Sequence, residues 1–192
     1  MSIDEQREPI LATARELYGR VVYSHKTHEQ EREIWAGKAC TMNRINIWLT
    51  SLTTLFAVIS AALKPTWALV LTALFAAATV AFALYQSGFD PVGKENQHRT
   101  AAKELLWIRE QLLLLITECH LPDSSQKHLE RCLEVLTREL TAVYKFAPNT
   151  SPEAYASAEK MIKSSHFTFS DDEIDTLLPS ALRKNGPKLG DA

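Results

Sequence analysis

Glycine is scarce in this sequence, and the enzyme motifs that depend on glycine are missing. Only six of the 192 residues are glycine, and none of them cluster into a loop that could hold a phosphate group. The sequence also lacks the glycine-flanked serine of a nucleophile elbow and any recognisable kinase or nuclease motif. We therefore predict that the protein is not an enzyme and has no cofactor.

Cysteine is also rare, and the charges nearly cancel. The three cysteines, Cys40, Cys119 and Cys132, are odd in number and lack the close spacing of a disulfide framework, which favours free thiols in a reducing compartment. The 21 basic residues are balanced by 23 acidic ones, so the charge predicts no direct contact with nucleic acid. The N-terminus is acidic and does not have the basic-then-apolar order of a cleavable signal peptide.

Charge is almost absent from the middle of the chain, where Lys64 is the only charged residue between residues 45 and 85. Residues 45–63 and 67–85 are uncharged, and each stretch would form a helix about 28 Å long, whereas the hydrocarbon layer of a membrane is about 30 Å thick. Pro65, between them, requires a tight reversal. The pattern predicts a transmembrane hairpin over residues 45–85. The alternative, two buried helices of a soluble bundle, is disfavoured because such helices seldom run so far without a charge.

The residues at the ends of the two predicted spans indicate their orientation. Trp48, Trp67 and Tyr85 carry amphipathic rings of the kind that gather at the boundary between lipid and water. Basic residues flank the hairpin, whereas its turn has Lys64 alone, so by the positive-inside rule we expect both termini in the cytoplasm. The flanking basic residues are Arg32, Lys38, Arg44, Lys94, Arg99 and Lys103.

The two spans contain hydroxyl groups but no ionisable side chain. The absence of charge inside the membrane argues against a proton relay or an ion-coupled transporter. Many small residues would allow close helix packing, and four hydroxyl groups are candidates for lining a pore or for bonding between helices. Alternatively, these hydroxyl groups bond to the backbone of their own helix, and both interpretations stay open at this point. The four candidates are Thr53, Ser60, Thr72 and Thr79.

Residues 1–44 are predicted to form an N-terminal cytoplasmic helix that continues into the first span. Apolar residues recur every three or four positions, at Ile10, Ala14 and Leu17, which is the spacing of one helix face. No glycine or proline lies between Gly37 and the first span. A single long helix that leads directly into the membrane is therefore the simplest outcome.

Residues 86–146 are predicted to form a cytoplasmic helical hairpin. After a break at residues 90–93, a helix over residues 94–119 carries apolar residues on more than one face and therefore requires more than one packing neighbour. A turn at residues 121–124 precedes a heptad seam. The seam suits packing on the preceding helix better than an intermolecular zipper, although both can coexist. It consists of Leu129, Leu133, Leu136, Leu140 and Val143.

Residues 147–192 are predicted to form short helices and a flexible tail. Ser151 can cap a helix that begins at Pro152 and extends to about Lys163. A second, brief helix is predicted to begin at Ser170, and the end of the chain is expected to be disordered.

Two groups of histidine and cysteine residues are possible metal ligands, but neither is predicted to bind a metal. His25 and His28 share a helix face, but the local sequence supplies no third ligand. The second group could converge across the turn at residues 121–124, but it lacks the Cys-x-x-Cys spacing of common zinc sites, so its thiols are expected in the core. That group consists of Cys119, His120, His128 and Cys132.

Several segments, in their order along the chain, resemble the SLATT proteins, two-span effectors of bacterial conflict systems. These segments are residues 23–29, the hairpin, and residues 106–110, 147–151 and 169–175. The last two resemble the SLATT subfamily found beside reverse transcriptases or nucleotide-signalling genes. The resemblance implies a pore-forming or membrane-perturbing effector of the bacterial inner membrane. It also implies activation during phage infection by a separate sensor or signalling protein, such as a reverse transcriptase or a nucleotide-signalling enzyme.

The sequence therefore predicts an all-α membrane protein, in which a two-helix transmembrane hairpin is joined to long cytoplasmic helices that form a helical bundle. Two spans per chain cannot enclose a channel, so a pore in the lipid bilayer requires a homo-oligomer. The rival hypothesis is a passive membrane-anchored helical scaffold that recruits a partner protein. The candidates for cytoplasmic assembly or regulation are His25, His28, Trp107, Arg109, Glu110, Leu133, Leu136 and Leu140.

Overall fold

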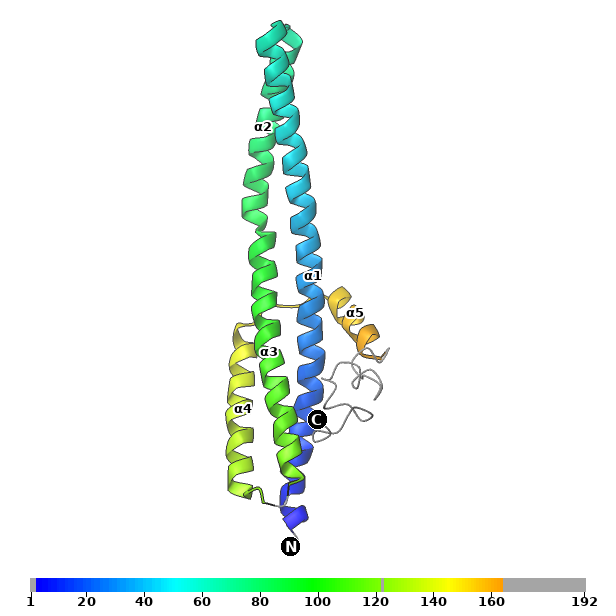
Figure 1. Ribbon diagram of the computed structural model, residues 1–192, viewed down its shortest axis with the longest axis vertical. Helices are drawn as coiled ribbons and strands as arrows, with labels where there is room; N and C mark the ends of the chain where they lie inside the picture. The colour runs from blue at the N-terminus through cyan, green and yellow to red at the C-terminus, as the bar shows by residue number, and fades with distance from the viewer. Residues whose placement is uncertain (1–2, 122, 164–192) are drawn as a thin grey trace, which may run out of the picture.

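The computed structural model describes residues 3–121 and 123–163, and this part of the chain folds into five helices without a strand (Figure 1). The helices α1 and α2 form the long hairpin at the top of the figure, and α3 continues below α2. The bounds are α1 Ile3–Leu63, α2 Thr66–Phe89, α3 Pro91–Cys119, α4 Gln126–Phe146 and α5 Pro152–Lys163. The second helix predicted for the tail, from Ser170, lies outside the described residues.

The helix α1 is unusually long, because nothing in the sequence stops it before the hairpin turn. Its 61 residues correspond to about 90 Å at the usual rise per residue. Pro9 lies near its first turn, and no other proline interrupts it. The predicted long helix leading into the first span is confirmed, and a displacement at its N-terminal end can reach the span through one continuous element.

The hairpin turn consists of two residues, Lys64 and Pro65. Lys64 adopts a left-handed conformation, with φ of 52°, and its N–H donates to the carbonyl of Ser60 at 3.0 Å. Pro65 is extended and immediately precedes α2. Below the turn, the rings of Phe56 and Phe75 stack at 5.5 Å between centroids, which joins the two spans face to face.

A single residue, Asp90, separates α2 from α3. Its backbone is left-handed, and its side-chain Oδ1 accepts a hydrogen bond of 3.0 Å from the N–H of Gly93. The break predicted over residues 90–93 is therefore shorter than expected, because Pro91 occupies the first turn of α3, where its missing N–H costs nothing. A Cβ on Gly93 would lie 2.0 Å from the Asp90 carboxylate, so glycine is what permits this cap.

The apolar core lies in the bundle below the spans, where α1 packs on α3 and α3 packs on α4. Leu105, Ile108 and Leu112 of α3 are completely enclosed, which agrees with the broad apolar surface expected for this helix. Three leucines of the predicted seam are buried on the same core from α4. They are Leu129, Leu136 and Leu140.

The apolar surface of the hairpin is not covered by protein. In the most apolar 18-residue window of the first span, no residue is buried. In the corresponding window of the second span, only 6% of the residues are buried. The core helices of a soluble bundle would be buried, so the soluble alternative fails. The chain is an all-α membrane protein with two spans, which confirms the predicted fold class.

Candidate functional site

Six polar side chains are buried together between the apolar core and the spans, and we call them the polar layer. Five come from α1, which turns this face toward α3 and α5, and one comes from α3. Polar groups are rarely buried without partners, so this concentration in one place marks a specific site. The polar layer consists of His25, Thr27, His28, Gln30, Glu31 and His98.

His28 and His98 face each other across the interface between α1 and α3. Their Nδ1 atoms lie 3.0 Å apart, so one ring donates and the other accepts, which requires at least one neutral imidazole. Burial lowers the pKa of His28 to about 4, and the neighbouring His98 adds to this effect. Burial also lowers the pKa of His98, although Glu31 opposes it. The pair is therefore neutral at physiological pH.

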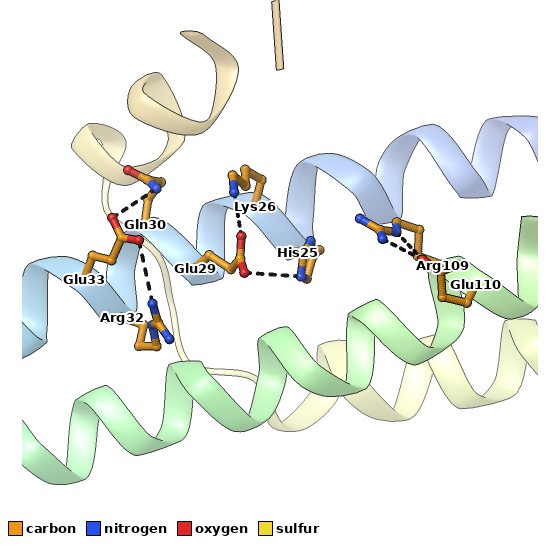
Figure 2. A network of polar contacts seen from close by, with 8 residues as sticks. All are labelled: His25, Lys26, Glu29, Gln30, Arg32, Glu33, Arg109 and Glu110. Atoms are coloured by element: carbon orange, nitrogen blue, oxygen red, sulfur yellow. Dashed lines mark hydrogen bonds and ion pairs between the residues drawn. The ribbon is translucent and has the colours of Figure 1, made fainter. Parts of the chain in front are cut away.

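His25 lies on the same helix but has different partners (Figure 2). Its Nε2 is 3.8 Å from Glu29, which also accepts a 2.7 Å hydrogen bond from Lys26. Burial lowers the pKa of His25, with Glu29 opposing it, and Arg109 and Glu110 of α3 act on it from across the interface with opposite signs. The two predicted histidines therefore do not form a shared metal site within the described residues.

Glu31 connects α1 to the start of α5. Its Oε2 accepts hydrogen bonds from the Ser151 N–H at 3.0 Å and the Ser151 hydroxyl at 2.7 Å, and its Oε1 accepts one from the Trp35 indole at 3.1 Å. Burial raises the pKa of Glu31, but the hydrogen bonds from Ser151, together with His98 and the Trp35 indole, lower it, and the net pKa is lowered. Ser151 also caps α5, as predicted, because its Oγ accepts from the Ala154 N–H at 3.2 Å.

Two further contacts hold α5 against α1. The Ser157 hydroxyl donates to Gln30 at 2.6 Å, and the rings of Tyr23 and Tyr155 stack with centroids 6.3 Å apart. Within the helix itself, only two small residues, Ala154 and Ala158, are buried. The attachment of α5 therefore depends on a few polar contacts rather than on a large apolar interface, and this is the kind of contact that a partner can displace.

An aromatic cluster lies between the polar layer and the spans. The ring of Trp35 on α1 is 5.4 Å from that of Phe89 at the end of α2, and the ammonium groups of Lys38 and Lys94 lie 4.1 and 4.4 Å from the Trp35 centroid. Because Trp35 also donates to Glu31, a continuous series of contacts runs from α5 to the base of both spans.

The four hydroxyl residues predicted in the spans are half-buried where α1 and α2 face each other. The hydroxyls of Thr53, Thr72 and Thr79 each donate to the carbonyl four residues earlier at 2.8 Å. This is the geometry of the alternative in which such groups bond to their own backbone. A pore-lining role for these residues and for Ser60 stays a prediction.

Comparison with protein families decides the identity of this two-span bundle. Residues 10–173 match the SMODS and SLOG-associating 2TM effector domain family 4, a SLATT family. The chain belongs to this family. The match extends from the start of the bundle, through both spans, to a point beyond α5, and it confirms the resemblance seen in the sequence. No curated protein and no solved structure matches the chain.

The other candidate residues of this SLATT chain lie in two environments. Leu136 and Leu140 are in the core, and Leu133 packs partly against it, so these leucines join α4 to the bundle. Trp107, by contrast, is 60% exposed on α3. Arg109 forms an ion pair with its neighbour Glu110, and both lie toward His25, as Figure 2 shows.

The sequence analysis missed four residues of the polar layer, and it missed Ser151 as a partner of Glu31. The four residues are Thr27, Gln30, Glu31 and His98. A signal for His98 was available, because it shares a helix face with the buried Ala102 and Leu105 of α3. A polar residue on an apolar face calls for a partner. No comparable local signal exists for the contact between Glu31 and Ser151, which are 120 residues apart.

Proposed function

We propose that the protein is a conflict-system effector of the bacterial inner membrane, with both termini in the cytoplasm. In this proposal the chain oligomerises and opens a pore, or otherwise perturbs the membrane, when a partner triggers it during phage infection. The observation that carries the proposal is the continuity of α1, which contains both the α5 attachment at Glu31 and the whole first span. A change at the cytoplasmic site can thereby move a membrane helix.

Assembly of several copies is needed because one hairpin has no interior for water. The spans of a single chain pack on each other and leave their outer faces exposed and apolar, for example at Trp48, Leu63 and Leu84. In lipid, such faces contact either hydrocarbon or a second copy. Rotation of the spans within a ring would expose the hydroxyl groups that now lie between α1 and α2.

The cytoplasmic helices restrain the spans in the resting state. The neutral His28–His98 pair and the hydrogen bonds of Glu31 keep α1, α3 and α5 in one arrangement. A separate sensor, such as a reverse transcriptase or a nucleotide-signalling enzyme, would bind the surface around α5 and displace it. Release of α5 then removes the hydrogen bonds that Ser151 makes to Glu31 and frees α1 to move.

The proposal is tested by a Glu31→Gln variant expressed in cells that report membrane potential and dye leakage. The Glu31 carboxylate accepts three hydrogen bonds, two from Ser151 and one from Trp35. A glutamine amide has only one oxygen, so its NH₂ group would face at least one of these donors and that hydrogen bond would be lost. We expect leakage without any trigger. The matched control is Glu16→Gln, an exposed glutamate of the same helix. Intact membranes after confirmed triggering of the unaltered protein would refute the proposal.

A passive membrane-anchored scaffold is the second candidate, and the backbone-bonded hydroxyls of Thr53, Thr72 and Thr79 favour it. Replacement of both spans by an unrelated hairpin of equal length separates the two functions. Preserved function would support the scaffold. Loss of toxicity on changing Thr53, Ser60, Thr72 or Thr79 to leucine, with assembly intact, would support the pore.

A further inference from the structure

Three side chains with metal-binding atoms converge at the end of the bundle opposite the hairpin. Glu118 belongs to the last turn of α3, and His128 and Cys132 lie one turn apart on α4. His128 Nε2 is 3.4 Å from Glu118 Oε2 and 3.5 Å from Cys132 Sγ, and all three ligand atoms lie within 4.8 Å of one another. The sequence analysis considered two of these residues but not Glu118.

Cys119 and His120, the other two residues of the group that the sequence analysis considered, do not take part. Cys119 is buried in the core, where burial raises the pKa of its thiol, and the His120 ring bonds to the carbonyl of Ile116 at 2.7 Å. The cluster in the structure therefore differs from the group considered in the sequence, because it combines the two α4 residues with Glu118 of the preceding helix.

We propose that Glu118, His128 and Cys132 bind a divalent transition-metal ion of the zinc class. Zinc takes thiolate, imidazole and carboxylate ligands in a tetrahedron with bonds of about 2.0–2.3 Å, which places ligand atoms about 3.3–3.6 Å apart. Both contacts of His128 Nε2 have this separation. The Cys132 Sγ is also 3.9 Å from His128 Nδ1, so the thiol lies beside the ring and has to rotate toward Nε2 when the two residues share an ion. Calcium and magnesium take oxygen ligands, so a thiol and an imidazole in the same site select against them.

Hydrogen bonding alone does not account for this cluster as well as a metal does. If Nε2 carries a hydrogen, it donates well to Glu118 or to Cys132, but not to both. If Nε2 instead accepts a hydrogen bond from the Cys132 thiol, it has no hydrogen to donate to the Glu118 carboxylate, which is also an acceptor. Nε2 and Glu118 then form no hydrogen bond with each other. One cation satisfies all three groups and leaves a fourth position for water or for a further ligand.

The site lies at the end of a groove of about 340 Å³ between α3 and α4, whose apolar wall includes Trp107, Leu114 and Val135. The neighbouring turn is already held from α1, because Arg7 donates to the carbonyls of Leu121, at 2.5 Å, and Ser124. A bound ion would add a second link at this end by joining α3 directly to α4. Metal binding is therefore expected to stabilise the bundle, whether or not the hairpin forms a pore.

The full chain in detergent or nanodiscs, stripped with a chelator, tests the proposal by titration with cobalt(II) and then by zinc competition against a chromophoric chelator. We expect one cobalt ion per chain and a thiolate-to-cobalt absorption band in the near ultraviolet, which Cys132→Ser abolishes. Loss of a residue that only supports a metal ligand typically weakens metal binding about 10–100-fold. His128→Gln and Glu118→Gln each remove a ligand, so each should weaken zinc binding by more than this. The matched controls, Cys40→Ser and His120→Gln, should keep both the band and the affinity.

Folding is followed in parallel, because Cys132 packs partly against the core whereas His128 is exposed. Zinc should raise the thermal unfolding midpoint of the unaltered protein and leave that of His128→Gln unchanged. Absence of the thiolate band, or equal loss of zinc affinity in the control variants, overturns the proposal. If Cys132→Ser does not fold, unchanged zinc affinity in both His128→Gln and Glu118→Gln overturns it as well.

Discussion

At the scale of single residues, the polar layer replaces apolar packing with side chains whose state depends on pH. His28 and His98 occupy positions on helix faces that otherwise carry the core. The pKa values of both histidines are lowered by folding. At a pH below the usual histidine pKa, the folded protein therefore binds fewer protons than the unfolded chain. The contribution of this pair is fully present above pH of about 6.5 and is lost as the pH falls toward the His28 value of about 4.

This sign gives a prediction for the stability of the bundle. Between pH 7 and pH 5 the free energy of unfolding should fall, with a contribution from His28 on the order of 2 kcal/mol, and His28→Gln should flatten the dependence. Thermal unfolding at several pH values, followed by circular dichroism in detergent, measures it. His120→Gln is the control, because this histidine is exposed and should keep the full slope. An identical slope in both variants would assign the effect to carboxylates instead.

At the scale of elements, α5 is held against α1 by a small set of side-chain contacts. Ser151→Ala removes the hydroxyl group that caps α5 and that donates a hydrogen bond to Glu31, each loss typically costing about 1 kcal/mol, whereas the backbone N–H of residue 151 keeps its bond to Glu31. We expect faster amide hydrogen exchange over α5 without a change in α3. Ser125→Ala is the control, because Ser125 occupies the capping position of α4 but its side chain makes no capping bond. Equal exchange in the two variants would contradict the proposed attachment.

Elements were also what the sequence predicted best. The limits of α5, the long run of α1 and the turn at Pro65 follow from local features, namely a capping serine, an absence of breakers and a proline between two apolar stretches. The connection between α2 and α3 was predicted too long, because Pro91 can either end a helix or begin one. In the structure Pro91 begins α3, because Asp90 adopts a left-handed conformation and its side chain caps that helix.

At the scale of the whole molecule, we expect the proposed assembly to include contact between copies outside the membrane as well as within it. Trp107 is an exposed aromatic residue of the bundle, and such residues dominate the energetics of interfaces. We expect Trp107→Glu to reduce the particle mass in nanodiscs compared with the unaltered protein. Thr100→Glu, which introduces the same charge at an exposed polar residue of α3, is the control and should assemble normally. A monomeric particle for the unaltered protein would refute assembly at rest.

The sequence alone determined that two helices cross a membrane and that the rest of the described chain is helical. Length without charge and the spacing of apolar residues are properties of contiguous segments, so they can be read without knowing where those segments meet. Only the tertiary structure decided which polar groups meet. His28 and His98 are 70 residues apart, and Glu31 and Ser151 are 120 apart. Their contacts depend on the rotation and register of packed helices, which the pattern along one helix does not specify.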